Sequence, residues 1–185
     1  APGRSGERPV SKNRSNTTVS NRFGLEEYFR IARQQKWESI IVVNFLDGLA
    51  RKKPLAEAVR HAAALVAYCN APLGQKLPEG ATDWPAVRAA NGHPEPHAIK
   101  IFQIGNEWWL PDKNSDVDQA LGNPSPEKKA AWYIECLLAY AQAIHEVDPT
   151  VELIIDGKMG GDFEALVLAD PRVKKAVKYA AFHHY

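Results

Sequence analysis

A carboxylate and two indoles follow directly after an apolar run in the middle of this 185-residue chain. The run at residues 99–104 is typical of a buried strand, and it stops at Gly105, where a side chain would obstruct a close backbone approach. Glu107 then stands next to Trp108 and Trp109. Partial desolvation raises the pKa of a carboxyl group toward the operating pH, and indole faces stack on sugar C–H surfaces. The combination indicates acid–base chemistry on a carbohydrate, although a Glu here could also cap a helix or pair with a lysine.

Other polar residues stand where further apolar runs end. We expect strands near residues 39–45, 99–105, 151–156 and 180–184, because these segments are apolar and rich in strand-forming residues. The polar residues at their ends are Asn44 and Asp47, Asn106 and Glu107, Asp156 and Lys158, and His183, His184 and Tyr185.

Two of these strand ends limit the choice of catalytic groups. Asp156 is the nearest competitor of Glu107 because it also ends a strand, but Lys158 could pair with it and keep it ionised. His183 and His184 are neighbours on one strand, so their rings point to opposite faces. The two histidines therefore cannot both serve one site without distortion.

Composition excludes several classes of function. The chain is 45% hydrophobic with a formal net charge of +1, which suits one globular domain and gives no basic face for nucleic acid. The sequence has no apolar run of membrane-spanning length, no glycine-rich phosphate loop and no His-Glu-x-x-His motif. We therefore expect no cofactor, no metal, and neither a nucleic-acid nor a membrane partner. Cys69 and Cys136 fall in helical patterns and are expected to be reduced and buried, which leaves the compartment, cytoplasmic or secreted, open.

Helical and loop patterns fill the chain between the predicted strands. Residues 1–22 are polar and without periodicity, so we expect a loop or disordered lead-in, followed by one domain over residues 23–185. Ser125 is a plausible N-cap, with Pro126 at the first helical position. The remaining expectations are helices at 23–36, 54–70 and 126–147, a long loop at 71–97 with one short helix near Trp84, a polar loop at 111–124, and two short helices starting at Asp162 and Asp170.

This alternation of strands and helices predicts an α/β fold with parallel strands and right-handed crossovers. In (β/α)₈ barrels and in open doubly wound sheets, functional sites form at the carboxyl edge of the strands. The absence of a glycine-rich loop in the sequence weakens the nucleotide-binding version of such a fold.

Several short motifs resemble one family when they are taken together. They are Asn21-Arg22-Phe23-Gly24, Tyr68-Cys69-Asn70, the segment from Trp84 to Pro96, Gly105-Asn106-Glu107 and His183-His184-Tyr185. This set is similar to the catalytic barrel of the α-L-arabinofuranosidase family, within the large clan of (β/α)₈ retaining glycoside hydrolases. The resemblance covers residues 21–110 well, and residues 125–185 mainly through the order of elements. It implies a partial (β/α)₈ barrel containing strands three to six with their helices.

The resemblance also implies a role for individual residues. Glu107 matches the general acid/base at the end of the fourth barrel strand, and Asn106 matches the residue that hydrogen-bonds the sugar hydroxyl beside the reacting carbon. Tyr185 matches an aromatic residue that lies beside the nucleophile, and His183 matches the histidine two positions before it. Asn44 falls where the family carries an asparagine that faces the pocket. The implied substrate is an arabinose-containing oligosaccharide, polysaccharide or small glycoside, with xylosidase and endoglucanase specificities as related possibilities.

Two departures from the family pattern shape the expectations. Trp108-Trp109 replaces a smaller or methionine-containing continuation, which changes the shape of the subsites and marks both residues as candidate sugar contacts. No residue matches the family's nucleophile, a Glu after strand seven, although a retaining glycosidase needs two carboxyl groups about 5–5.5 Å apart. We therefore expect a fragment that is inactive alone, and that forms homo-oligomers or associates with the missing half of the barrel.

Two alternatives stay open at this point. The first is a non-catalytic carbohydrate-binding or scaffold domain, in which Trp84, Trp108 and Trp109 act as stacking platforms. The second is an unrelated α/β domain in which Glu107 has a purely structural role. A Glu after a seventh strand in the complete protein would separate the enzymatic hypothesis from the first alternative.

Overall fold

A parallel sheet is the centre of the computed structural model, which describes residues 10–12, 16–158 and 161–183. Its strand order is β3-β4-β5-β6, and all neighbouring strands run parallel. The α/β architecture and the four strands predicted from the sequence are confirmed. The strands are β3 (Ile40–Val43), β4 (Ile101–Ile104), β5 (Glu152–Lys158) and β6 (Tyr179–His183).

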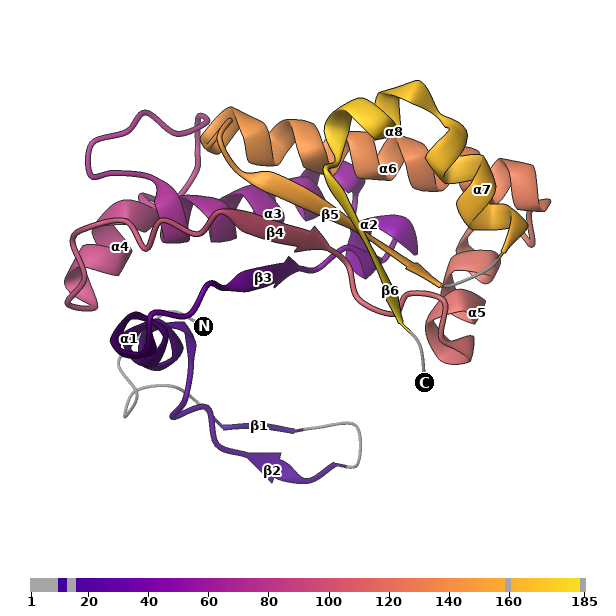
Figure 1. Cartoon of the computed structure of the whole chain (residues 1–185). Coiled ribbons are helices and arrows are strands. Elements are labelled where there is room, and N and C mark those ends of the chain that lie inside the picture. The colour runs from indigo at the N-terminus through magenta and orange to yellow at the C-terminus, as the bar shows by residue number, and fades with distance from the viewer. Residues whose placement is uncertain (1–9, 13–15, 159–160, 184–185) are drawn as a thin grey trace.

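Helices connect these strands and cover one face of the sheet. In the view of Figure 1, α3, α6, α7 and α8 lie on one side of the strands, whereas α1 and the β1–β2 pair lie on the other. None of the described helices is long and apolar enough to cross a membrane. The helices are α1 (Leu25–Gln35), α2 (Leu46–Leu49), α3 (Leu55–Asn70), α4 (Trp84–Ala90), α5 (Pro111–Ala120), α6 (Pro126–Val147), α7 (Asp162–Ala169) and α8 (Pro171–Ala176).

The long helix α6 begins where its sequence predicted. The Ser125 hydroxyl accepts a hydrogen bond from the Lys128 backbone amide at 3.4 Å, and Pro126 occupies the first turn, where a missing N–H costs nothing. The helix ends at Val147, just before Asp148-Pro149. The local signal at Ser125 and Pro126 sets where α6 starts, and its apolar stripe then sets the face that packs on the sheet.

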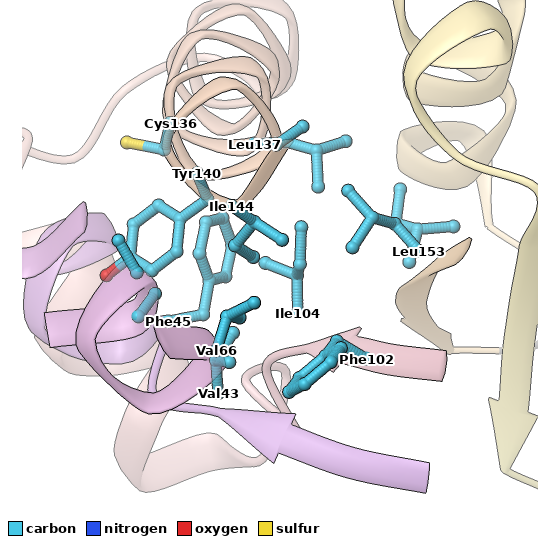
Figure 2. Packing of buried hydrophobic residues seen from close by; sticks show 14 of the residues in the cluster. Val43, Phe45, Val66, Phe102, Ile104, Cys136, Leu137, Tyr140, Ile144 and Leu153 are labelled. Atoms are coloured by element: carbon cyan, nitrogen blue, oxygen red, sulfur yellow. The ribbon is translucent and has the colours of Figure 1, made fainter. Parts of the chain in front are cut away.

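The core lies between that stripe and the covered face of the sheet. Figure 2 shows Leu137, Tyr140 and Ile144 of α6 above the side chains of the neighbouring strands. Burial of each such side chain contributes about 1.5–3 kcal/mol. The strand side chains in this layer are Val43, Phe102, Ile104 and Leu153. Both cysteines are free and buried, as predicted.

The opposite face of the sheet is much more open. Along β3, burial alternates, so Ile41 and Val43 are buried whereas Ile40 and Val42 are 52% and 46% exposed. In a closed (β/α)₈ barrel, side chains on this face pack against those of the other strands. Within the described residues, β3 and β6 are the two edges of the sheet. The exposed apolar residues therefore mark the face that further strands of a barrel would cover.

Two motif residues hold the start of β4 in place. The Asn70 side chain pairs with Ile99 like a strand neighbour: its Nδ2 donates to the Ile99 carbonyl at 2.7 Å, and its Oδ1 accepts from the Ile99 amide at 2.9 Å. Arg88 is completely buried and donates to the backbone carbonyls of Tyr68, Ala71, His93 and Pro94. These bonds fix the end of α3 and the long loop, and with them the strand that leads to Glu107.

The prediction of a polar loop over residues 111–124 is wrong, because α5 occupies most of it. Pro111 and Asp112 in the first turn favour a helix start, but Val117 is the buried residue of the helix. A helix with so little apolar surface has almost no periodicity to recognise. Part of the predicted lead-in is also ordered: β1 (Ser11–Lys12) pairs with β2 (Thr18–Val19), while residues 1–9 and 13–15 lie outside the described part.

Candidate active site

A tight turn after β4 presents the candidate acid/base. Gly105 has φ +85°, and a Cβ at this position would lie 3.1 Å from the Cβ of Phe45. Glu107 has φ +53°, a left-handed conformation that costs a residue with a side chain about 1–2 kcal/mol. Strained backbone of this kind concentrates at functional sites. The turn therefore accepts a conformational cost while it places the Glu107 carboxylate at the carboxyl edge of the sheet.

Glu107 belongs to a chain of three ionisable side chains at this edge. Its Oε1 lies 3.2 Å from His183 Nδ1, and the other ring nitrogen, Nε2, lies 3.3 Å from Asp156 Oδ1. The exposed side-chain fractions are 20% for Glu107, 24% for His183 and 0% for Asp156. An imidazole thus joins a solvent-accessible carboxylate to a buried one.

Burial dominates the electrostatics of Asp156. It raises the pKa of this carboxyl to about 6, and the negative charge of Glu107 adds to the rise. The backbone amides of Glu107 and Trp108 and the His183 imidazole act in the opposite direction. Among the described residues, however, no hydrogen bond of good geometry reaches either carboxylate oxygen. The side chain of Lys158, the predicted partner of Asp156, lies outside the described part.

The two tryptophans have different environments. Trp108 is 5% exposed, and its ring centroid lies 5.3 Å from that of Tyr133 and 4.9 Å from that of Phe163. Trp109 is half-buried and meets the His183 ring edge-on at a centroid distance of 5.1 Å. Trp109 is therefore the indole that stands beside the ionisable chain, whereas Trp108 is mostly a core residue.

Both indoles line a groove of about 490 Å³ beside α5, the start of α6 and α7. Its polar wall is a cluster from α5 and α6, in which Lys129 Nζ lies 2.6 Å from Asp118 Oδ1 and Asn114 Nδ2 donates to Asp118 Oδ2 at 3.0 Å. Sequence reasoning missed this wall because it assigned residues 111–124 to a loop. Amide, carboxylate and ammonium groups beside apolar ring faces form a lining suited to a polyhydroxylated ligand.

The remaining predicted site residues are placed as follows. Asn44 is exposed directly after β3, and its Oδ1 accepts from the Asp47 amide at 3.3 Å. Asn106 is exposed beside Glu107, and its backbone carbonyl accepts from Lys113 Nζ at 3.0 Å. Both asparagines thus follow strands at the same edge of the sheet. Tyr185 lies outside the described residues.

These positions limit what the site can do chemically. Glu107 is accessible enough to exchange a proton with a bound molecule, whereas the side chain of Asp156 has no exposed surface and cannot attack one. Over residues 10–12, 16–158 and 161–183, no three His, Cys, Asp or Glu side chains are grouped in a way that could hold a metal ion. Of the two carboxylates that contact His183, Glu107 is therefore the accessible one and is suited to general acid–base work.

Known proteins match this chain over three quarters or more of its length. The family model of the alpha-L-arabinofuranosidase 1 domain matches residues 2–185. Alpha-L-arabinofuranosidase C of Emericella nidulans is 29% identical over 143 residues, which are 77% of this chain and 23% of that protein. Intracellular exo-alpha-(1->5)-L-arabinofuranosidase 1 of Bacillus subtilis is 28% identical over 176 residues, which are 91% of this chain and 29% of that protein.

Solved structures agree with the sequence matches. A family 51 alpha-L-arabinofuranosidase from Bifidobacterium longum has a TM-score of 0.71 at 23% identity, over 99% of this chain and 32% of that one. At this level of identity the likeness concerns the fold, and it confirms the predicted partial barrel. The chain spans less than a third of the length of each of these relatives.

Proposed function

The chain belongs to the alpha-L-arabinofuranosidase family, and we propose that it forms the acid/base part of a retaining glycoside hydrolase that releases α-L-arabinofuranosyl units. The observation that carries the proposal is the placement of Glu107. Its carboxylate is partly exposed in a strained turn at the carboxyl edge of the sheet, in contact with His183 and next to two indoles. Such a group can both give and take a proton.

Glu107 acts twice in this mechanism. It first protonates the leaving oxygen while a second carboxylate attacks the anomeric carbon, and it then removes a proton from the water that hydrolyses the glycosyl-enzyme. Asn106 and Asn44 bind sugar hydroxyls from the neighbouring strand ends, together with Tyr185. Trp109 offers a ring face at the rim of the site, and the neighbouring His183 also contacts the sugar.

The second carboxylate comes from a part of the protein outside this chain. Asp156 is linked to Glu107 through His183, but its side chain is wholly buried and cannot reach an anomeric carbon. This chain matches only 23% of the length of the Emericella nidulans relative, and the open face of its sheet carries exposed apolar residues. Both observations support further barrel strands beside β3 and β6. We propose that activity belongs to the complete barrel and that the present chain alone does not hydrolyse substrate.

The substrate class follows from the relatives and from the groove. Both relatives matched by sequence are named as arabinofuranosidases, and one of those names specifies exo action on α-(1→5) bonds. We propose that arabinan, arabinoxylan or a small arabinofuranoside is the substrate, with the groove beside Trp109 holding part of the leaving group. A groove of about 490 Å³ is large enough for one or two sugar units.

Hydrolysis of aryl glycosides by the complete protein tests this proposal. We expect cleavage of an aryl α-L-arabinofuranoside and little or none of the β-D-xyloside or β-D-glucoside. Proton NMR during the first turnovers should show the α-anomer of arabinose before mutarotation. Initial release of the β-anomer would contradict the retaining mechanism, and a clear preference for another glycoside would contradict the substrate assignment.

Carbohydrate binding without hydrolysis is the second candidate function, and the indole-lined groove favours it. A complete protein that binds arabino-oligosaccharides in calorimetry but releases no arabinose would establish this role. Measurable hydrolysis that disappears in the Glu107→Ala variant would exclude it.

A further inference from the structure

We infer that Asp156 is a positioning residue for the acid/base step, and that it holds His183 in the tautomer whose Nδ1 faces Glu107 as a hydrogen-bond acceptor. The inference rests on the proposed function for its catalytic meaning. Its structural basis is the pair of contacts on one imidazole, 3.3 Å from Nε2 to Asp156 Oδ1 and 3.2 Å from Nδ1 to Glu107 Oε1. Nothing in the family resemblance assigned a role to Asp156.

The protonation pattern follows from the needs of the buried carboxylate. A neutral imidazole has one N–H donor and one acceptor nitrogen, and its partners decide which nitrogen carries the hydrogen. Among the described residues, no hydrogen bond of good geometry satisfies either oxygen of Asp156, so this carboxylate has the stronger need for the Nε2–H. Such contacts are often long in an unliganded site and shorten in the complex. The lone pair of Nδ1 is then left facing Glu107.

This arrangement favours the acid form of Glu107 before reaction. A protonated Glu107 can donate its O–H to His183 Nδ1, and the negative charge of Asp156 strengthens the hold of the Glu107–His183 pair on that proton. In glycosylation the proton moves to the leaving oxygen, which keeps the electron pair of the broken C–O bond. In deglycosylation Glu107 takes a proton back from the attacking water. Asp156 and His183 end each cycle unchanged.

The Tyr133 phenol beside Asp156 does not compete for this role. Glu107 and His183 approach from the ends of β4 and β6, while Tyr133 of α6 and Glu164 of α7 line a small cavity beside Asp156. The Tyr133 hydroxyl donates to the backbone carbonyl of Asp156 at 3.1 Å rather than to its carboxylate. Burial raises the pKa of Tyr133 well above its ordinary value, so this group stays neutral.

The pH dependence of the complete enzyme tests the charge of Asp156. The alkaline limb of kcat/KM reports loss of the essential proton from the free enzyme. In Asp156→Asn it should move to lower pH by about 1 unit, because a neighbouring negative charge that stabilised the proton is gone. Glu152→Gln is the matched control, because it removes a charge from the start of the same strand, where Glu152 accepts a hydrogen bond from the Tyr179 hydroxyl at 2.8 Å. The pH profile of this variant should superimpose on that of the wild type. Superposition of the Asp156→Asn profile on the wild type would overturn the inference.

Nitrogen-15 NMR of histidine-labelled protein tests the orientation independently of catalysis. The His183 signal should show a protonated Nε2 and an unprotonated Nδ1 in the wild type, and Asp156→Ala should abolish this preference. An unchanged tautomer in Asp156→Ala overturns the inference even if activity falls, because a merely structural residue would produce the same loss. Hydrolysis that persists in the Glu107→Ala variant would instead overturn the proposed function, so the two failures are distinguishable. Thermal unfolding of both Asp156 variants confirms that the compared proteins are folded.

Discussion

Replacement of Gly105 by alanine should destabilise the protein more than the same replacement of a glycine that is also left-handed but has free space around its Cβ position. At Gly105, φ is +85° and the new Cβ would lie 3.1 Å and 3.3 Å from Cβ and Cδ1 of Phe45. The left-handed conformation costs alanine about 1–2 kcal/mol, and overpacking of a core adds about 1–3 kcal/mol. The sum is a loss of roughly 2–5 kcal/mol in the free energy of unfolding.

Gly122→Ala is the matched control for this substitution. Its φ is +70°, and nothing lies within 4 Å of the position of its Cβ, so it should lose only the conformational part, about 1–2 kcal/mol. Urea unfolding of both variants of the complete protein gives the comparison. Because Gly105 precedes Glu107 by two residues, kcat/KM of Gly105→Ala should also fall by roughly tenfold or more. Equal losses of stability in the two variants would refute the close approach of Gly105 to Phe45.

Three further predictions concern the buried acid, the indole at the rim and the open face. Burial raises the pKa of Asp156 to about 6. The protonated carboxyl therefore stabilises the fold fully below about pH 4, and this stabilisation is lost as pH rises through 6. Asp156→Asn should therefore unfold at a higher temperature than wild type at pH 7.5 and lose this advantage at pH 4.5; a difference independent of pH would contradict the assignment. Trp109→Ala should raise KM for arabino-oligosaccharides roughly tenfold or more, since covering an aromatic side chain contributes about 1.5–3 kcal/mol. Trp37→Ala, far from the site, should not change KM. The isolated chain should associate through its open face, and light scattering should show less association in the Ile40→Lys/Val42→Lys double variant. A monodisperse wild-type monomer would count against the proposal that further strands cover this face.

The strands and the start of α6 were predictable because their signals are local. β-branched residues mark Ile40–Val43, and a Ser-Pro pair at 125–126 opens α6 whatever packs around it. The position of Glu107 followed from the same reasoning, since a polar residue after a buried strand must lie at its carboxyl end. The long helix and the individual strands therefore needed no knowledge of distant contacts.

Contacts between distant residues were not predictable in the same way. His183 meets Glu107 and Asp156 because β5 and β6 pair in the register Asp156↔Ala181 and Lys158↔His183, and a slip of one residue would turn His183 to the other face. The sequence pattern does not specify that register. The same limit applies to the two indoles, which look equivalent in sequence until Phe163 of α7 covers Trp108.

The helix α5 was missed for a different physical reason. Its residues are mostly polar, and Val117 is its buried residue, so it lacks the apolar stripe from which helices are recognised. As a result, the wall of Asn114, Asp118 and Lys129 beside the tryptophans was missed as well.

Glu107→Ala in the complete protein tests the central claim most directly. If Glu107 is the general acid/base, the variant should lose activity on glycosides with poor leaving groups far more than on activated aryl arabinofuranosides, because only the former need protonation. Added azide should restore turnover of the activated substrates by attacking the glycosyl-enzyme where water is no longer deprotonated, and the product should be the arabinosyl azide of retained configuration. Equal slowing of good and poor leaving groups, with no effect of azide, would contradict the account.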